Sequence, residues 1–306
     1  TPELIAACRE IAEKGYSIAL DDFVFAPDLK PLIEIADIIK FDFRADSMEQ
    51  IQSYLAQIEH HNGLHLLAEK VETQDEFKRA KEMGFEYFQG YFFCKPELVK
   101  GKEIAGSQLV LLQIMAAVNK ADFKFSELER LIAPDVSLSY KLLRYINSAF
   151  FAKAQTTTSI QQALVYMGEA EIRRFVSLVA MSGLARGKPD ELVRAACVRG
   201  KFCEMLTDGK PGSATASELF TLGIFSLIDA ILDQPMEKIM RELPLAEEIT
   251  RALVHRKGTL MGYLGLVEFY EKGQWPLVSR LAAALNIAES KLPEFYRQAC
   301  QWANTF

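Results

Sequence analysis

The chain has 306 residues, half of them hydrophobic, and a net charge of −6 at neutral pH. This length exceeds one ordinary domain and can bury a sizeable core, so we expect two domains. The modest negative charge, without runs of one sign, excludes a face that binds nucleic acid polymers or an anionic membrane through charge. No apolar run reaches the roughly 20 residues of a membrane span. Five scattered cysteines, none in Cys-x-x-Cys spacing, indicate reduced thiols and a cytoplasmic location.

The first hundred residues alternate strand and helix patterns. After a helix over residues 4–14, a strand over residues 18–23 ends in two adjacent carboxylates. Three more strands are predicted over residues 38–42, 66–72 and 87–93, with helices over residues 29–36, 47–60 and 74–83 between them. Such repetition implies a parallel sheet with right-handed crossovers. A closed (β/α)₈ barrel takes about 250 residues, so this segment predicts a partial barrel with an open edge that needs a cover.

Acidic side chains end or follow successive strands of this predicted sheet. Asp21 and Asp22 end the first strand, and Glu69 and Glu72 lie at the end of the third. Carboxylate oxygens are the ligands that Mg²⁺ and Mn²⁺ prefer, and Lys40 on the second strand could orient a water or screen phosphate charge. A solvated pair of loop acids is the alternative for any one pair alone. Their recurrence at successive strand ends favours a site for phosphodiester hydrolysis by two metals.

Four motifs in one order resemble the second half of the EAL domain, the family of cyclic di-GMP phosphodiesterases. The resemblance covers residues 1–97. Asp21-Asp22-Phe23-Val24-Phe25-Ala26 matches the family's D-D-F-G-T-G, Lys40-Phe41-Asp42 its K-I-D, Ala68-Glu69-Lys70-Val71-Glu72-Thr73 its A-E-G-V-E-T, and Gln89-Gly90-Tyr91-Phe92-Phe93-Cys94-Lys95-Pro96 its closing Q-G-Y-x-F-x-x-P.

The resemblance implies roles for the residues that match these motifs. The implied metal ligands are Asp21, Asp22 and Glu69, and the implied catalytic residues are Lys40, which would position water, with Glu69, Glu72 and Gln89. The Glu-Ala-Leu tripeptide and the early-strand ligands are absent, and bulky residues replace the flexible Gly-Thr-Gly. We therefore expect a vestigial site that takes no cofactor as the chain stands, and takes Mg²⁺ or Mn²⁺ only if ligands upstream of Thr1 complete it.

From about residue 101 the pattern becomes helical, which predicts an all-helical domain over residues 101–306 after the partial barrel of residues 1–100. Ile172, Phe175, Val176, Val179 and Ala180 form one apolar stripe. Residues 131–139, 142–148 and 160–164 resemble the HDOD domain, a regulatory relative of HD-type metal phosphohydrolases. No His-Asp pair occurs, and His255 is the only histidine beyond residue 100. An HD metal site is therefore excluded on ligand count.

An EAL-like module followed by an HDOD module resembles a family of bacterial signal-transduction proteins. We expect a non-catalytic EAL-like module that can still sense cyclic di-GMP, and an HDOD module that contacts other signalling proteins. The alternative is a cyclic di-GMP phosphodiesterase whose remaining metal ligands lie upstream of Thr1. We also expect the open half-barrel to be covered, by an upstream segment, by the helical domain or by a second copy in a homodimer.

Overall fold

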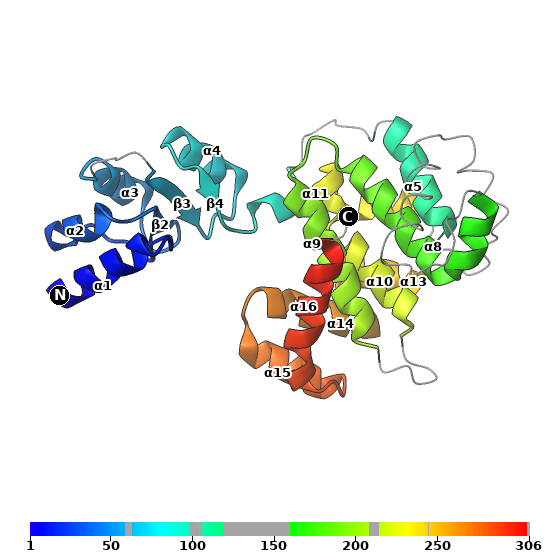
Figure 1. The fold of residues 1–306 in the computed structure, drawn as a ribbon. Coiled ribbons are helices and arrows are strands. Elements are labelled where there is room, and N and C mark those ends of the chain that lie inside the picture. Colours follow the sequence, from blue (N-terminus) through cyan, green and yellow to red (C-terminus); the bar gives the residue numbers. More distant parts are fainter. Residues whose placement is uncertain are drawn as a thin grey trace. The chain divides into compact units, whose positions relative to one another are not determined.

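The computed structural model describes residues 1–58, 63–97, 104, 106–118, 160–207, 214–243 and 245–304. These residues form two compact units, Thr1–Lys95 and Pro96–Phe306. In Figure 1 the first runs from blue to cyan and the second from cyan to red. The HDOD-like stretches over residues 131–139 and 142–148 lie outside the described residues.

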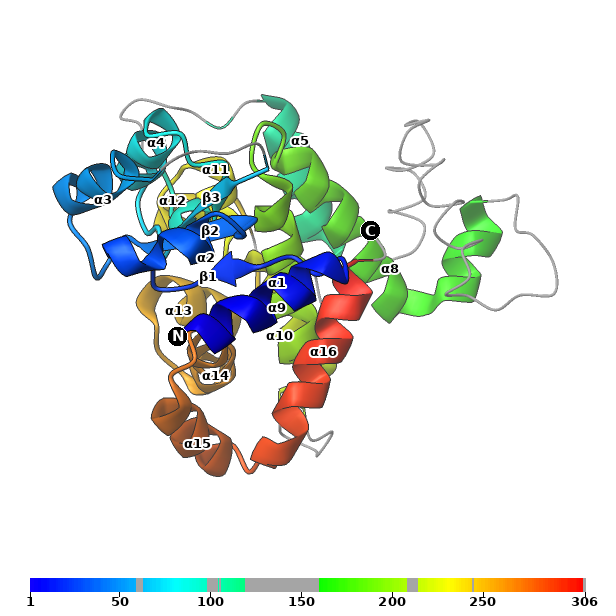
Figure 2. The same ribbon diagram turned by 60° about the vertical axis from the view of Figure 1, so that its left-hand side comes forward.

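The first unit is built on a four-stranded parallel sheet in the order β1-β2-β3-β4. The strands are β1 (Ala19–Leu20), β2 (Ile38–Asp42), β3 (His65–Glu69) and β4 (Tyr87–Phe88). The helices are α1 (Pro2–Glu13), α2 (Lys30–Ile33), α3 (Met48–Leu55) and α4 (Gln74–Glu82), with 3₁₀ turns at Pro27–Leu29 and Phe92–Cys94. The predicted parallel strand–helix alternation is thus present, and Figure 2 shows β1, β2 and β3 side by side.

Two helices of this unit begin with capping boxes. Ser47 accepts a hydrogen bond from the backbone N–H of Gln50, whose side chain caps Ser47 in return, and Thr73 and Glu76 make the same exchange before α4. Each box satisfies backbone donors that a helix start leaves unpaired. The boxes fix where the chain turns from β2 into α3 and from β3 into α4, and so hold the loops at the carboxyl ends of these strands.

Aromatic side chains form much of the core beneath the sheet. Phe41 is fully buried and meets Phe23 and Phe85 edge-to-face, with ring centroids 5.5 and 5.6 Å apart. Phe43 contacts Phe85 in the same way at 5.3 Å. Such pairs contribute about 0.5–1.5 kcal/mol beyond the area they bury. The core therefore fixes the backbone at Phe41, which lies between Lys40 and Asp42, and at Phe43, which directly follows β2.

The two outer strands are shorter than the sequence pattern predicts. Asp22 has a φ of 45°, which interrupts β1 after Leu20, although the Phe23 N–H still donates to the Lys40 carbonyl. The fourth strand ends at Phe88 because the chain turns around Val71, whose N–H donates to the Gln89 carbonyl. Within the described residues β1 and β4 each pair with one strand only, so the sheet is open.

The turn after β4 requires a glycine, and its substitution is expected to destabilise the first unit. Gly90 has a φ of 155°, and a Cβ there would lie 2.0 Å from the Val71 carbonyl oxygen. We expect Gly90→Ala to cost at least about 2 kcal/mol, within the range for overpacking. Hydrogen exchange of the Val71 and Gln89 amides measures this. Gly84→Ala is the control, because Gly84 also has a positive φ (92°) but open space around it. Equal protection in both variants would contradict the expectation.

The second unit is helical throughout its described part. Its α-helices are α5 (Gly106–Val118), α8 (Ile160–Leu184), α9 (Asp190–Met205), α10 (Ala216–Phe225), α11 (Ile228–Leu232), α12 (Met236–Glu242), α13 (Glu247–His255), α14 (Thr259–Glu271), α15 (Trp275–Ala284) and α16 (Leu292–Ala303), with a 3₁₀ turn at Glu289–Lys291. No helix among the described residues is long and apolar enough to cross a membrane.

The predicted apolar stripe of α8 is buried. Ile172, Phe175, Val176 and Ala180 are each at most 4% exposed, and Val179 is partly buried. Trp275, by contrast, is 54% exposed and packs edge-on against Tyr270. It is the first residue of α15, and its backbone N–H donates to the Gly273 carbonyl at 3.0 Å in the turn after α14.

Candidate functional site

The residues singled out by the sequence lie at the carboxyl ends of the first three strands. Asp21 follows β1, Lys40 lies within β2, and Glu69 ends β3 beside Asp42 in the register of the sheet. Because these strands run parallel, their carboxyl ends share one edge of the sheet, where α/β folds place their chemistry.

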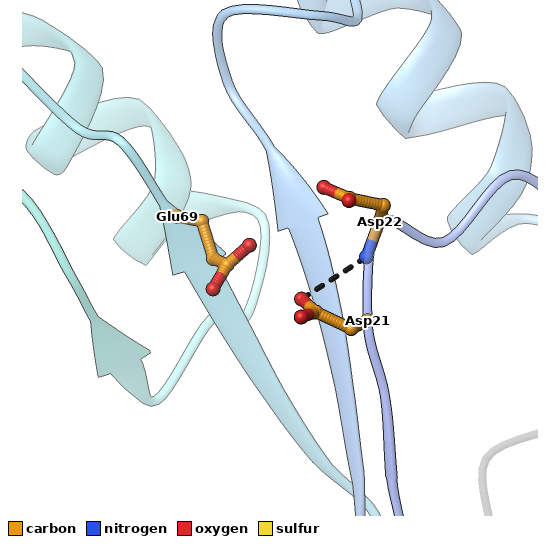
Figure 3. A group of neighbouring side chains, drawn as sticks. All are labelled: Asp21, Asp22 and Glu69. Carbon is orange, nitrogen blue, oxygen red and sulfur yellow. Dashed lines mark hydrogen bonds between the residues drawn. The ribbon is translucent and has the colours of Figure 1, made fainter. Parts of the chain in front are cut away.

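Three of the predicted acidic residues converge at this edge. Asp21, Asp22 and Glu69 each offer a carboxylate oxygen, and these oxygens all lie within 4.8 Å of one another. Asp21 and Asp22 are exposed, whereas Glu69 is 6% exposed. Figure 3 shows Glu69 approaching Asp21 and Asp22 across β2, and the Asp22 N–H donates to the Asp21 Oδ1 at 3.1 Å. The positive φ of Asp22 turns the chain so that both aspartates reach this point.

Lys40 lies between two of these carboxylates. Its Nζ is 2.9 Å from the Asp21 Oδ1 and 2.6 Å from the Glu69 Oε1. The hydrogen bonds that Lys40 donates to Glu69 and, to a smaller extent, to Asp21 raise the pKa of Lys40, and the same bond to Asp21 lowers the pKa of that carboxyl. The ammonium and the Asp21 carboxylate are therefore both charged at neutral pH, and the cluster has less negative charge than its three acids alone.

The pH dependence of Asp21 provides a test of this contact. Because its folded pKa lies below the ordinary value, the Lys40 contact favours the folded state at neutral pH, and that contribution is lost as the pH falls through the lowered pKa. We expect Lys40→Met to raise the pKa of Asp21. The titration of Asp21 is measured by ¹³C NMR of its carboxyl carbon. Lys14→Met, which removes an exposed ammonium paired with Glu10, is the control and should leave that titration unchanged. An Asp21 titration unaffected by Lys40→Met would show that the contact does not persist in solution.

Asp42, the acid of the Lys-x-Asp motif, is held outside this cluster. Lys70 forms an ion pair with its Oδ2, and the backbone N–H groups of Arg44 and Ala45 donate to its Oδ1 at 2.7 and 3.1 Å. Burial raises the pKa of Asp42, but Lys70 and the two amides outweigh it and lower the pKa overall. Lys70 has a φ of 54°. The family pattern has glycine at this position, which was the sequence signal for a left-handed residue.

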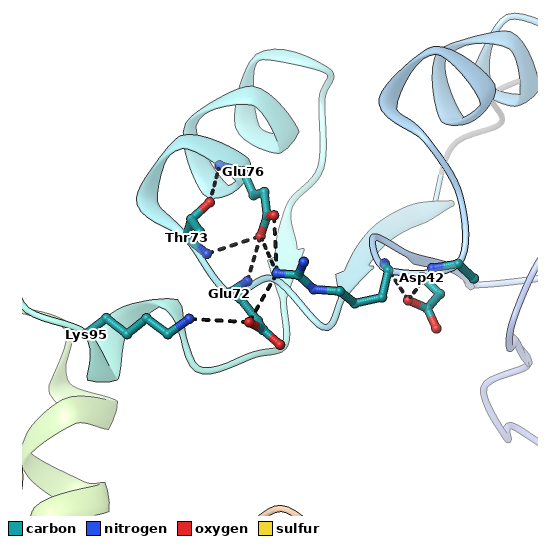
Figure 4. Close-up of polar contacts among 7 residues, drawn as sticks. Asp42, Glu72, Thr73, Glu76 and Lys95 are labelled. Atoms are coloured by element: carbon teal, nitrogen blue, oxygen red, sulfur yellow. Dashed lines mark hydrogen bonds and ion pairs between the residues drawn. The ribbon is translucent and has the colours of Figure 1, made fainter.

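Glu72 and Gln89 are also not brought into the carboxylate cluster. The Glu72 Oε2 lies 3.2 Å from a side-chain nitrogen of Arg44 and 3.3 Å from the Nζ of Lys95, and Figure 4 shows Lys95 reaching toward the Glu72 carboxylate. Gln89 is exposed, and its backbone N–H donates to the Ala68 carbonyl at 2.8 Å. The role of Arg44 was not predictable from the sequence, because nothing in a strand pattern indicates which carboxylate a long side chain will reach.

In the helical unit, charged groups gather around residues 223–229, where the chain passes from α10 into α11. Arg199 of α9 contacts Glu271 through three atom pairs of 2.8–3.0 Å, and its Nη1 donates to the Ser226 Oγ at 3.3 Å. Burial raises the pKa values of Glu271 and of Asp229. His255, at the end of α13, is exposed.

Both halves of the chain match known domain families. The EAL domain model matches residues 1–96 and the HDOD domain model residues 107–251. These matches confirm the resemblance drawn from the sequence motifs. The chain belongs to the family of EAL–HDOD signal-transduction proteins, and two relatives that match nearly its whole length also show this.

Two curated relatives match nearly the whole chain. The cyclic di-GMP phosphodiesterase CdgJ of Vibrio cholerae is 34% identical over 304 residues, which cover 99% of this chain and 70% of the relative. The uncharacterized protein YuxH of Bacillus subtilis is 34% identical over 316 residues, covering 99% and 75%. No solved structure matches the chain.

Proposed function

We propose that the EAL-like unit binds cyclic di-GMP through one divalent cation without hydrolysing it, and that the HDOD unit passes this state to other signalling proteins. The observation that carries the proposal is the convergence of Asp21, Asp22 and Glu69 at the strand ends of an EAL domain. The odd number and scattered positions of the five cysteines, none in Cys-x-x-Cys spacing, support a cytoplasmic location for such a protein.

The donor set fits a hard divalent cation. Three carboxylate oxygens within 4.8 Å of one another suit Mg²⁺ or Mn²⁺, which prefer oxygen ligands. Asp21, Asp22 and Glu69 would hold the ion, and the bound ion would supply positive charge for the phosphodiester oxygens of the nucleotide. Lys40 provides a second positive charge at the same place, because its ammonium already lies against Asp21 and Glu69.

The other acids at this edge support binding without hydrolysis. Hydrolysis by two metals needs carboxylates enough for two neighbouring ions. Asp42 pairs with Lys70, and Glu72 pairs with Arg44 and Lys95, and neither belongs to the group of carboxylates whose oxygens lie within 4.8 Å of one another. Three carboxylates remain at the strand ends of the described first unit, and three suit a single ion.

The test combines binding with turnover. The purified chain is dialysed against cyclic di-GMP with Mn²⁺ or with EDTA, and the nucleotide is then separated by anion-exchange chromatography. We expect retention that depends on Mn²⁺ and recovery of intact cyclic di-GMP. Loss of retention in Asp21→Asn would tie binding to the cluster. Equal retention with EDTA would argue against binding through a cation.

Hydrolysis of cyclic di-GMP is the second candidate, and the name of the relative CdgJ favours it. This activity would need ligands in addition to the three carboxylates of the cluster. Linear dinucleotide that accumulates with Mn²⁺ and disappears in Asp21→Asn would establish it. The proposal has two further parts: the HDOD unit associates with other proteins, and the chain forms a homodimer that covers the open sheet. Sedimentation of the full chain tests the homodimer.

A further inference from the structure

Arg44 lies at the centre of a set of contacts that tie two strand-end loops together. From the loop after β2, its Nη2 lies 3.2 Å from the Glu72 Oε2 and 3.3 Å from the Glu76 Oε1. Figure 4 shows that Asp42, on one side, and Glu72 and Glu76, on the other, lie on different segments of the chain, which the Arg44 contacts connect. One guanidinium therefore joins the loop after β2 to the loop after β3.

The loop after β3 is held to the loop after β2 at three successive points. The Glu69 carbonyl accepts from the Phe43 N–H at 3.1 Å, Lys70 pairs with Asp42, and Glu72 pairs with Arg44. These contacts lie at Glu69, the buried carboxylate of the cluster, and at the residues that follow it. A shift of the Glu69 backbone away from Asp21 and Asp22 therefore requires these three contacts to open.

The Arg44 contact can be removed without unfolding α4, because Glu76 caps this helix independently of Arg44. The Glu76 Oε2 accepts from the backbone N–H groups of Glu72 and Thr73 at 2.8 and 3.1 Å, and these bonds complete the capping box of α4 without Arg44. The arginine adds the link from this capped turn back to the Asp42 loop. Loss of Arg44 should therefore loosen the segment from Glu69 to Glu72 while α4 stays capped.

We propose that Arg44 is a positioning residue for the carboxylate cluster and sets its affinity for a divalent cation; this inference rests on the function proposed above. Arg44 acts through Glu72 and the backbone, at a distance from the cluster itself. Groups that orient metal ligands through hydrogen bonds typically change metal affinity by 10–100-fold. A planar guanidinium can engage two carboxylates at once, a geometry that a lysine ammonium reproduces poorly.

The experiment compares Mn²⁺ binding to the full chain by electron paramagnetic resonance. We expect Arg44→Gln to weaken binding by about tenfold and Arg44→Lys to restore part of that loss. The control is Arg9→Gln, which removes the same charge from an exposed side chain of α1 that pairs with the exposed Glu34 at 4.0 Å. A shift in the thermal midpoint equal to that of the control shows that folding is not the cause. Unchanged Mn²⁺ affinity in Arg44→Gln would overturn the proposal.

A second readout separates this proposal from the metal site on which it rests. Without metal, Arg44→Gln is expected to speed hydrogen exchange of the Phe43 amide, which donates to Glu69, and to leave the Glu76 amide of the capping box unchanged. Normal exchange at Phe43 would contradict positioning by Arg44 even if the wild-type chain binds Mn²⁺. Absence of Mn²⁺ binding in the wild type, with faster exchange at Phe43, would reject the proposed function and leave Arg44 as a purely structural link.

Discussion

Replacing Arg199 with leucine is expected to destabilise the helical unit by about 3–5 kcal/mol, because it leaves the Glu271 carboxylate buried without its cation. The side chains of Arg199 and Glu271 are only 7% and 11% exposed, and they join α9 to the end of α14. The two tryptophans of the chain, Trp275 and Trp302, both lie in this unit. Their fluorescence during urea denaturation therefore reports its unfolding.

Three comparisons make this expectation specific. The double variant Arg199→Leu, Glu271→Leu should recover much of the loss, since it removes both charges. Arg297→Leu breaks an exposed pair with Glu294 in the same unit and should change the midpoint little, because solvent screens an exposed ion pair. In Arg199→Leu the unpaired Glu271 should have a raised pKa, so its penalty should grow as the pH rises through that value. Similar midpoints for Arg199→Leu and Arg297→Leu would contradict the account.

Neutralising one acid of the cluster is expected to abolish cation binding. Loss of one of the three carboxylate charges removes part of the attraction to the ion and one of its ligands, so binding should weaken by at least roughly a hundredfold. Asp21→Asn and Glu69→Gln test this by titration calorimetry with Mn²⁺. Asp28→Asn, an exposed acid in the 3₁₀ turn after β1, is the matched control. Equal affinities in Asp28→Asn and Glu69→Gln would place the cation elsewhere.

The order of the four parallel strands and the acids near their carboxyl ends were predictable from the sequence, because apolar runs of strand length and the order of four motifs are local signals. Asp21, Asp22 and Glu69 meet as the parallel arrangement requires. The ion-pair partners of the Asp42 and Glu72 side chains were not predictable. These partners are Lys70, Arg44 and Lys95, whose long side chains reach acids 23–28 residues away in the chain.

The shortness of the outer strands depends on backbone conformation that a hydrophobic pattern does not encode. The run over residues 87–93 is apolar enough for a long strand, yet it bends at Gly90 because its backbone follows Val71. The helical stripe of α8 was predictable because one face of it is buried throughout. The buried pair of Arg199 and Glu271 was not, since its partners come from helices far apart in the sequence.

The central claim is that the cluster of Asp21, Asp22 and Glu69 holds cyclic di-GMP through a divalent cation and leaves it intact. Phosphorus NMR of cyclic di-GMP with the full chain and Mn²⁺ tests this most directly, because the paramagnetic ion broadens the signal of a phosphate bound beside it. We predict broadening with the wild-type chain, none with Glu69→Gln, and no phosphomonoester signal over hours. Absence of broadening with the wild-type chain, or a phosphomonoester signal that disappears in Glu69→Gln, would contradict the claim.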